Sequence, residues 1–155
     1  NSLIFDSNKK QNFLDMIRKV TVEWQGGMSF ESDDPSGNTT LMDTHVEGSD
    51  ELFGVSPKTM MLSALAGCSG IDVVSILNKM KITDYEFSMD IEGELTQEHP
   101  KYFHKVTIRY YFKGNDLNQS KFKKAVDLSV DKYCGVMEMF RRFAEISIDI
   151  QYQNK

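Results

Sequence analysis

Hydrophobic and polar positions along the chain fall into segments of two different periods. Residues 17–24 (IRKVTVEW) largely alternate apolar and polar side chains and are rich in β-branched residues, which predicts a half-buried strand. Residues 28–32 and 39–44 flank the segment 33–38 (DDPSGN), whose Pro, Ser, Gly and Asn suit a hairpin connection. The N-terminal part is therefore predicted to be a small antiparallel meander.

A long helix is predicted next. Ser56 and Pro57 supply an N-cap and a proline at the first helical position. From about residue 57 to residue 80, apolar side chains occupy nearly every face of the helix, which is typical of a buried helix. The most apolar run, residues 60–70, is far shorter than the ~20 residues that span a bilayer, so we expect no membrane segment.

Two longer alternating stretches, residues 85–96 and 102–114, predict a hairpin of strands. Residues 116–133 then carry apolar side chains at helical spacing, and a second short helix begins after a break at the Cys-Gly pair 134–135. The chain ends in another alternating strand, residues 145–152. The order βββ-α-ββ-αα-β predicts an α+β fold.

Length, charge and cysteine count narrow the class of protein. The length of 155 residues suits a single domain over 16–155, or one subunit of an intertwined dimer. The polar residues 1–15 are interpreted as an N-terminal arm or an expression remnant. The net charge of −5 is dispersed, so we expect no nucleic-acid surface. Two cysteines do not make a secreted disulfide framework and no signal segment opens the chain, which favours a cytoplasmic protein.

Cys68 lies about three turns into the predicted long helix, close to Gly67 and Gly70. Each glycine inside a helix costs about 1 kcal/mol relative to alanine, so their presence here calls for a reason. One interpretation is that a small hydrophobic side chain fills a close helix contact, since free cysteine is among the most buried residue types. The other is that the glycines leave space around the sulfur for a small substrate or a second thiol.

Cys134 lies where one helical pattern ends and another begins, and is therefore expected at a helix N-terminus. The unpaired backbone N–H groups and the helix dipole favour the thiolate at such a position, and the nearby Lys132 adds to this effect. Simple packing of a buried cysteine is the alternative. The first interpretation makes Cys134 a reactive thiol.

The remaining chemistry-bearing residues offer no metal or nucleotide site. His45, His99 and His104 are too scattered in the sequence to bind one ion together. The sequence contains no HExxH motif, paired CxxC motif, Walker loop or dinucleotide glycine fingerprint. We therefore expect neither a metal nor a cofactor.

Three segments together resemble the OsmC/Ohr family, the osmotically inducible and organic hydroperoxide resistance proteins. Residues 56–77 (SPKTMMLSALAGCSGIDVVSIL) are similar to the first-cysteine helix of the family. Residues 99–114 (HPKYFHKVTIRYYFKG) are similar to its central hairpin, and residues 125–136 (AVDLSVDKYCGV) to its second-cysteine helix junction. The likeness covers Met16 to Tyr152, nearly the whole chain.

This resemblance implies a fold and an activity. The fold would be an intertwined α+β homodimer with antiparallel sheets and two central helices packed across the interface. The activity would be thiol-dependent reduction of a small organic hydroperoxide, with Cys68 as the attacking sulfur, Cys134 as the resolving sulfur and an external dithiol as the reductant. Small neighbours of Cys68 would then let the two sulfurs approach bonding distance.

Two positions depart from the hydroperoxide-reducing members that the chain resembles. Those members carry arginine directly after a glycine pair, where this chain has Met28, and glutamate nine or ten residues before the first cysteine, where it has Lys58 and Thr59. Without this couple we expect a weak thiol peroxidase of the divergent OsmC-like branch, with its substrate left open. The alternative is non-enzymatic binding of a small apolar molecule at the dimer interface, in a pocket that the cysteines only line.

Overall fold

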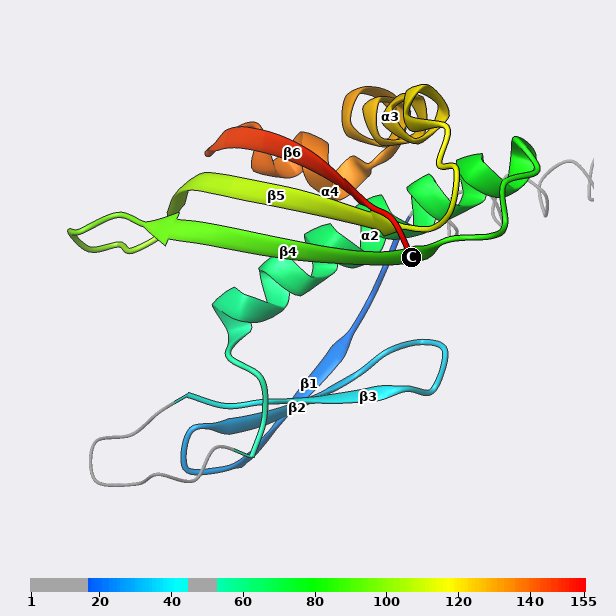
Figure 1. Cartoon of the computed structure of the whole chain (residues 1–155). Helices are drawn as coiled ribbons and strands as arrows, with labels where there is room; N and C mark the ends of the chain where they lie inside the picture. The colour runs from blue at the N-terminus through cyan, green and yellow to red at the C-terminus, as the bar shows by residue number, and fades with distance from the viewer. Residues whose placement is uncertain (1–16, 45–52) are drawn as a thin grey trace, which may run out of the picture. The chain divides into compact units, whose positions relative to one another are not determined.

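The computed structural model describes residues 17–44 and 53–155 (Figure 1). The chain divides into two compact units, Asn1–Pro57 and Lys58–Lys155. Three strands, a helix, two strands, a helical segment in several pieces and a final strand follow one another, which confirms the predicted α+β order. The predicted N-terminal arm, residues 1–15, lies outside the described residues. The single domain over 16–155 stays a prediction.

The N-terminal unit contains a three-stranded antiparallel sheet in the order β1-β2-β3. Its strands are β1 (Thr21–Gly26), β2 (Ser29–Asp33) and β3 (Thr39–Met42). The turn after β1 requires glycine, because Gly26 and Gly27 have φ angles of 100° and 54°, which side chains with a Cβ atom rarely adopt. β1 begins four residues later than predicted because its partner β2 ends at Asp33, which pairs with Thr21.

The C-terminal unit contains a second three-stranded sheet in the order β4-β5-β6 (Figure 1). Its strands are β4 (Glu86–Leu95), β5 (Phe103–Lys113) and β6 (Glu145–Gln153). β4 and β5 pair antiparallel, as predicted, whereas β5 and β6 pair parallel. The expectation of antiparallel sheets is corrected at this pair. The helical segment between β5 and β6 returns the chain to the end of the sheet at which β5 begins. β6 therefore runs in the same direction as β5.

The long predicted helix is α2 (Pro57–Lys79). Only one face of it is buried in this chain, by Leu65, Ser69, Val73, Ile76 and Leu77, whereas Ile71 is 72% exposed. The sequence predicted a helix that is buried on nearly every face. In this chain only one face of α2 is buried, because a single small sheet covers only one side of a helix. By length and composition alone α2 could also cross a membrane, a test that core helices of soluble proteins pass as well.

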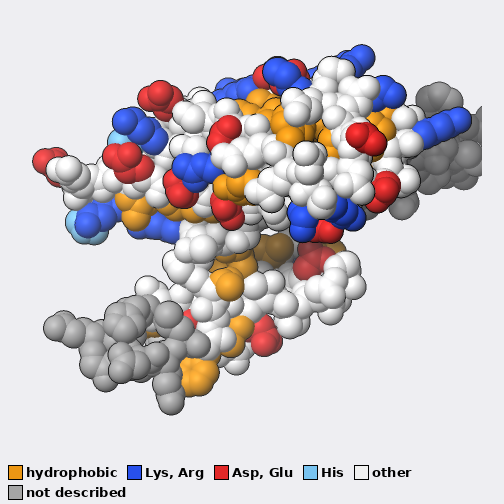
Figure 2. Space-filling view, viewed as in Figure 1, with side chains coloured by type: hydrophobic (Ala, Val, Ile, Leu, Met, Phe, Trp, Pro, Cys, Tyr) orange, Lys and Arg blue, Asp and Glu red, His pale blue; other side chains and the backbone are white. Residues whose placement is uncertain are grey.

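The core of the C-terminal unit lies between its sheet and its helices. Alternate side chains of β5 are buried: Val106, Ile108, Tyr110 and Phe112. The ring of Phe112 stacks on Phe87 at 4.8 Å between centroids and meets Phe122 at 4.7 Å. On the face that Figure 2 shows, side chains of both charges are interspersed over this unit, in agreement with the dispersed charge of the sequence.

The helical segment predicted over 116–133 consists of two elements. α3 (Gln119–Leu128) begins after Asn118, whose side chain accepts a hydrogen bond from the backbone N–H of Lys121 at 3.3 Å. It continues as a turn of π-helix, η1 (Ser129–Tyr133), and the short helix α4 (Gly135–Phe140) follows. The N–H of Cys134 donates to the carbonyl of Ser129 at 2.9 Å. The wider π turn thus sets the direction in which Cys134 leaves the helix, and such turns are frequent at functional sites.

Candidate functional site

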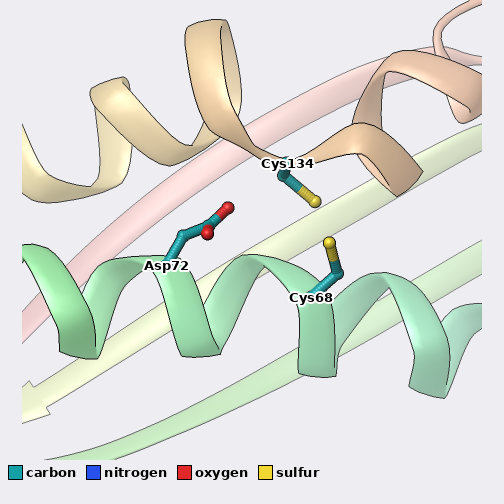
Figure 3. A group of neighbouring side chains, drawn as sticks. All are labelled: Cys68, Asp72 and Cys134. Atoms are coloured by element: carbon teal, nitrogen blue, oxygen red, sulfur yellow. The ribbon is translucent and has the colours of Figure 1, made fainter. Parts of the chain in front are cut away.

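The structure brings Cys68 and Cys134 together. Cys68 is half-buried in α2, and Cys134 is 4% exposed between η1 and α4. Both are free thiols, and their sulfurs point toward one another (Figure 3). The two sulfurs and a carboxylate oxygen of Asp72 all lie within 4.8 Å of one another. A small approach of the two segments would bring the sulfurs to the ~2 Å of a disulfide bond.

Cys134 occupies the predicted helix N-cap, but burial opposes the thiolate that this position favours. Its sulfur accepts a hydrogen bond from the N–H of Met137 at 3.3 Å, which lowers the pKa. Burial, followed by the hydrogen bond with the Cys68 thiol, outweighs this contact and raises the pKa of Cys134 to about 11. Lys132 does not reverse the balance, since its Nζ lies over the Tyr133 ring, 5.3 Å from the centroid.

Gly67 and Gly70 do not surround the sulfur of Cys68. They line a hollow of about 840 Å³ on another face of α2, and Cys68 is not part of its lining. A Cβ atom at Gly70 would lie 3.3 Å from the sulfur of Met89, whereas one at Gly67 would meet nothing within 4 Å. The space that these glycines leave open in this chain thus belongs to a hollow that Cys68 does not line, since neighbouring helix residues point in directions about 100° apart.

Three buried hydroxyl groups adjoin the thiol pair. The Oγ of Ser69 lies 2.6 Å from the Oη of Tyr110 and 2.9 Å from the Oγ of Ser129. The Ser129 hydroxyl also donates to the backbone carbonyl of Ser69 at 3.2 Å. Burial raises the pKa of Tyr110 to about 12, so its phenol stays protonated at neutral pH. These hydrogen bonds join α2, β5 and η1 beside the cysteines. They hold the segment that carries Cys68 and the segment that precedes Cys134 in a fixed position relative to each other.

Asp72 lies one helical turn after Cys68 and therefore on the same face of α2. It is half-buried, and its carboxylate points toward the segment that carries Cys134 (Figure 3). Its Oδ2 lies 3.4 Å from the Oγ of Ser129. Within residues 17–44 and 53–155 it takes part in no ion pair.

Neither Asp72 nor the three hydroxyl groups were predicted as site residues from the sequence. For Asp72 a signal existed, because a spacing of four residues from a cysteine on a helix places both side chains on one face. For Ser69 and Ser129 the signal was weak, since a serine beside or five residues before a cysteine has no special meaning in a regular α-helix. It is the π turn that makes both Ser129 and Cys134 face α2.

The set of Cys68, Asp72 and Cys134 also offers three atoms of the kinds that bind zinc. Structural zinc sites take four protein ligands, and the catalytic sites that use cysteine add a histidine. In the part of the chain that the structure describes, this set has neither a fourth ligand nor a histidine. We therefore interpret the cluster as a thiol pair beside a carboxylate.

Comparison with known proteins places the chain in a family. The family described as OsmC-like protein matches residues 47–149. The chain belongs to the OsmC-like protein family. Protein YhfA of Escherichia coli (strain K12) is 35% identical over 129 residues, which cover 83% of this chain and 93% of YhfA. The OsmC/Ohr resemblance of the sequence is thus confirmed.

Solved structures show the same OsmC-like fold. A hypothetical protein from Aquifex aeolicus VF5 superposes with a TM-score of 0.79 at 24% identity, over 90% of this chain and 98% of that one. The organic hydroperoxide resistance protein OhrB of Bacillus subtilis superposes with a TM-score of 0.62 at 16% identity, over 86% and 97% of the two chains. At these identities the likeness concerns the fold alone.

The two positions that depart from the hydroperoxide-reducing pattern lie apart from the thiol pair in the sequence. Met28 is 56% exposed in the turn between β1 and β2. Lys58 lies in the first turn of α2 and borders a separate hollow of about 260 Å³, together with Met61, Lys101, Tyr102, Phe103 and Phe143. The chain therefore offers no Arg–Glu couple at these positions of the OsmC-like fold.

Proposed function

We propose that this OsmC-like protein reduces organic hydroperoxides, with Cys68 as the attacking sulfur and Cys134 as the resolving sulfur. The observation that supports the proposal most directly is the meeting of two free thiols from segments far apart in the sequence. Organic hydroperoxide resistance proteins with the same fold support the substrate class.

The reaction has two steps in the protein. The Cys68 thiolate attacks the outer oxygen of the hydroperoxide, the O–O bond breaks, the alcohol leaves, and Cys68 becomes a sulfenic acid. Cys134 then attacks the Cys68 sulfur, the S–O bond breaks, water leaves, and the disulfide forms. An external dithiol reduces the disulfide, so each cycle consumes one hydroperoxide and the two hydrogens of that dithiol.

Accessibility supports this order of the two cysteines. Cys68 is half-buried, whereas Cys134 is only 4% exposed, so an incoming hydroperoxide reaches the Cys68 sulfur first. The raised pKa of Cys134, about 11, also makes it a poor first nucleophile. The reaction is slow, because loss of one preorganised charge-stabilising donor typically costs roughly 10²- to 10³-fold in rate.

Whole-protein mass spectrometry after one equivalent of cumene hydroperoxide tests the proposal. The wild-type protein should lose two hydrogens as the disulfide forms. The Cys134→Ser variant should stop at a sulfenic acid on Cys68 that dimedone labels, and the Cys68→Ser variant should consume no hydroperoxide. Dimedone label on Cys134 in the Cys68→Ser variant, with turnover retained, would reverse the assignment, and an unchanged wild-type mass would reject it.

A second candidate function is non-enzymatic binding of a small apolar molecule. The hollow of about 840 Å³ on α2 favours it, with a lining that includes Ile71, Val74 and Phe87. Because Cys68 lies outside this lining, binding there would be independent of the thiols. An environment-sensitive dye bound with equal affinity before and after alkylation of both cysteines, in a protein that does not react with hydroperoxide, would support this function instead.

We also propose that the protein is a cytoplasmic homodimer. The exposed apolar face of α2, with Ile71 at 72% exposure, supports a second copy as its partner. Two free thiols in contact suit a reducing compartment, where an external dithiol keeps them reduced. Sedimentation velocity of the reduced protein tests the dimer, and fractionation of cells tests the location.

A further inference from the structure

Closing a disulfide between Cys68 and Cys134 requires the removal of a proton from a buried group. The thiolate is the attacking form in thiol chemistry, yet burial raises the pKa of Cys134 to about 11. At neutral pH only a minute fraction of Cys134 is ionised in the resting protein. A base beside the sulfur would remove this barrier, because it takes the proton as the S–S bond forms.

Few groups near the two sulfurs could serve as that base. The titratable groups that face Asp72 from the surrounding elements are Cys68, Cys134, Tyr110, Lys79 and Tyr133. The phenol of Tyr110, with a pKa of about 12, is protonated and accepts no proton at neutral pH. Lys79 is a cation, and Tyr133 is an exposed phenol. The carboxylate of Asp72 is the anionic acceptor within 4.8 Å of both sulfurs.

The hydrogen bonds around Asp72 leave it available for this role. Its Oδ2 lies 3.4 Å from the Ser129 hydroxyl, which fixes the carboxylate on the side of the cysteines. It forms no ion pair within residues 17–44 and 53–155, so no neighbouring cation holds its charge in place. One water molecule or a side-chain rotation spans the remaining distance to either sulfur, which is within the reach of a general base.

Asp72 also connects the thiol pair with solvent. It borders a hollow of about 230 Å³, whose lining includes Ser75, Lys79 and Tyr133. This space is large enough for several water molecules, which occupy roughly 30 Å³ each in the liquid. Asp72 therefore borders this hollow and also lies within 4.8 Å of both sulfurs.

We propose that Asp72 is the proton acceptor of the Cys68–Cys134 pair. This inference rests on the proposed redox function of the two cysteines. When Cys134 attacks the sulfenic acid on Cys68, Asp72 takes the thiol proton and passes it to the departing hydroxide, so that the S–O bond breaks, the S–S bond forms and water leaves. When an external dithiol reduces the disulfide, Asp72 takes a thiol proton from that dithiol and passes it to the leaving Cys134 thiolate.

The test compares Asp72→Asn with wild type, Asp72→Glu and Ser63→Ala, with a metal chelator present. Asn keeps the size and can still accept the Ser129 hydrogen bond, Glu keeps the carboxylate, and Ser63 is an exposed residue of α2 outside the hollow beside Asp72, so it serves as the control. Diamide and cumene hydroperoxide are used as separate oxidants. Acid-quenched mass spectrometry follows the conversion of the oxidised Cys68 intermediate into the disulfide.

We expect Asp72→Asn to slow disulfide closure at neutral pH by roughly 10²-fold, the lower end of general-base catalysis, with either oxidant. Ser63→Ala should match wild type, and Asp72→Glu should recover part of the rate. From about pH 6 to 9, closure in Asp72→Asn should accelerate about tenfold per pH unit, because ionisation alone then supplies the thiolate. The deficit relative to wild type should shrink as the pH approaches the Cys134 pKa of about 11.

A purely structural role for Asp72 would give a different result, namely the same fractional loss of rate at every pH and no recovery in Asp72→Glu. That result, or equal closure rates in Asp72→Asn and Ser63→Ala, overturns the proposal. Slowed closure with diamide in a protein that does not consume hydroperoxide would support Asp72 as the proton acceptor and reject the peroxidase function. A wild-type protein that forms no Cys68–Cys134 disulfide with either oxidant overturns both.

Discussion

Alkylation of Cys134 in the Cys68→Ser variant measures how far burial raises the pKa of this thiol. The chain has two cysteines, so iodoacetamide can react only with Cys134 in this variant. The reaction rate follows the thiolate fraction, and its midpoint across pH gives the pKa directly. A serine at position 68 keeps a hydroxyl beside the sulfur, so the packing around Cys134 changes little.

The structure sets the expected size of the effect. Burial, the hydrogen bond with Cys68 and the Cys68 charge raise the Cys134 pKa from 9.0 to about 11, while the N–H of Met137 lowers it. Two pKa units mean a hundredfold smaller thiolate fraction at neutral pH, or about 3 kcal/mol between the two protonation states. The variant loses the contributions of Cys68 but keeps the burial, which is the largest cause, so we expect a midpoint that stays above 9.0.

The same pKa predicts how stability depends on pH. The folded protein holds the Cys134 proton more tightly than the unfolded chain does, so the stabilisation is complete below about pH 9 and is lost as the pH rises toward 11. The free energy of unfolding of the reduced wild-type protein should therefore fall over this window by up to about 3 kcal/mol. A Cys134→Ala variant should lack this part of the decline, and urea unfolding at several pH values measures the difference.

A midpoint below about 9, the ordinary value for a cysteine, would refute this reasoning. It would mean that the Met137 hydrogen bond and the N-cap position outweigh burial, in agreement with the first of the two interpretations of Cys134 from the sequence. The denatured variant in guanidinium serves as the control, because its Cys134 should alkylate with an ordinary midpoint. If the folded and the denatured variant have the same midpoint, the folded environment has no net effect on the pKa of Cys134.

The remaining predictions concern packing and assembly. Ser69→Ala should lower the free energy of unfolding by about 1–3 kcal/mol, because the buried Tyr110 hydroxyl loses its partner at 2.6 Å. Tyr110→Phe should lower the free energy of unfolding by less, and urea unfolding compares the two variants. Gly93→Ala should cost about 1–3 kcal/mol in the same assay, since a Cβ atom there would overlap the ring of Phe103. Ile71→Asp, at a side chain 72% exposed on α2, should convert a dimer into a monomer in sedimentation velocity, and an unchanged sedimentation coefficient would place the interface elsewhere.

The periodicity of the sequence was sufficient to predict the elements of the fold. The alternation of apolar and polar side chains over residues 106–110 (VTIRY) predicts a strand with one buried face, and Ser56 followed by Pro57 marks a helix start through local backbone chemistry. The position of Cys134 at a helix N-cap also followed from the pattern. These features depend on residues close together in the chain, so the sequence alone determines them.

The tertiary structure decided the chemistry at the cysteines. The parallel pairing of β6 with β5, the meeting of Ser69 with Ser129 and the approach of Asp72 to both sulfurs all join segments that no local pattern relates. The pKa of Cys134 depends on how much water the surrounding elements exclude, and this burial reverses the effect expected from the helix terminus. Local sequence sets the direction of a side chain along its own element, but what lies opposite it, and how much solvent remains there, is set only when the elements pack.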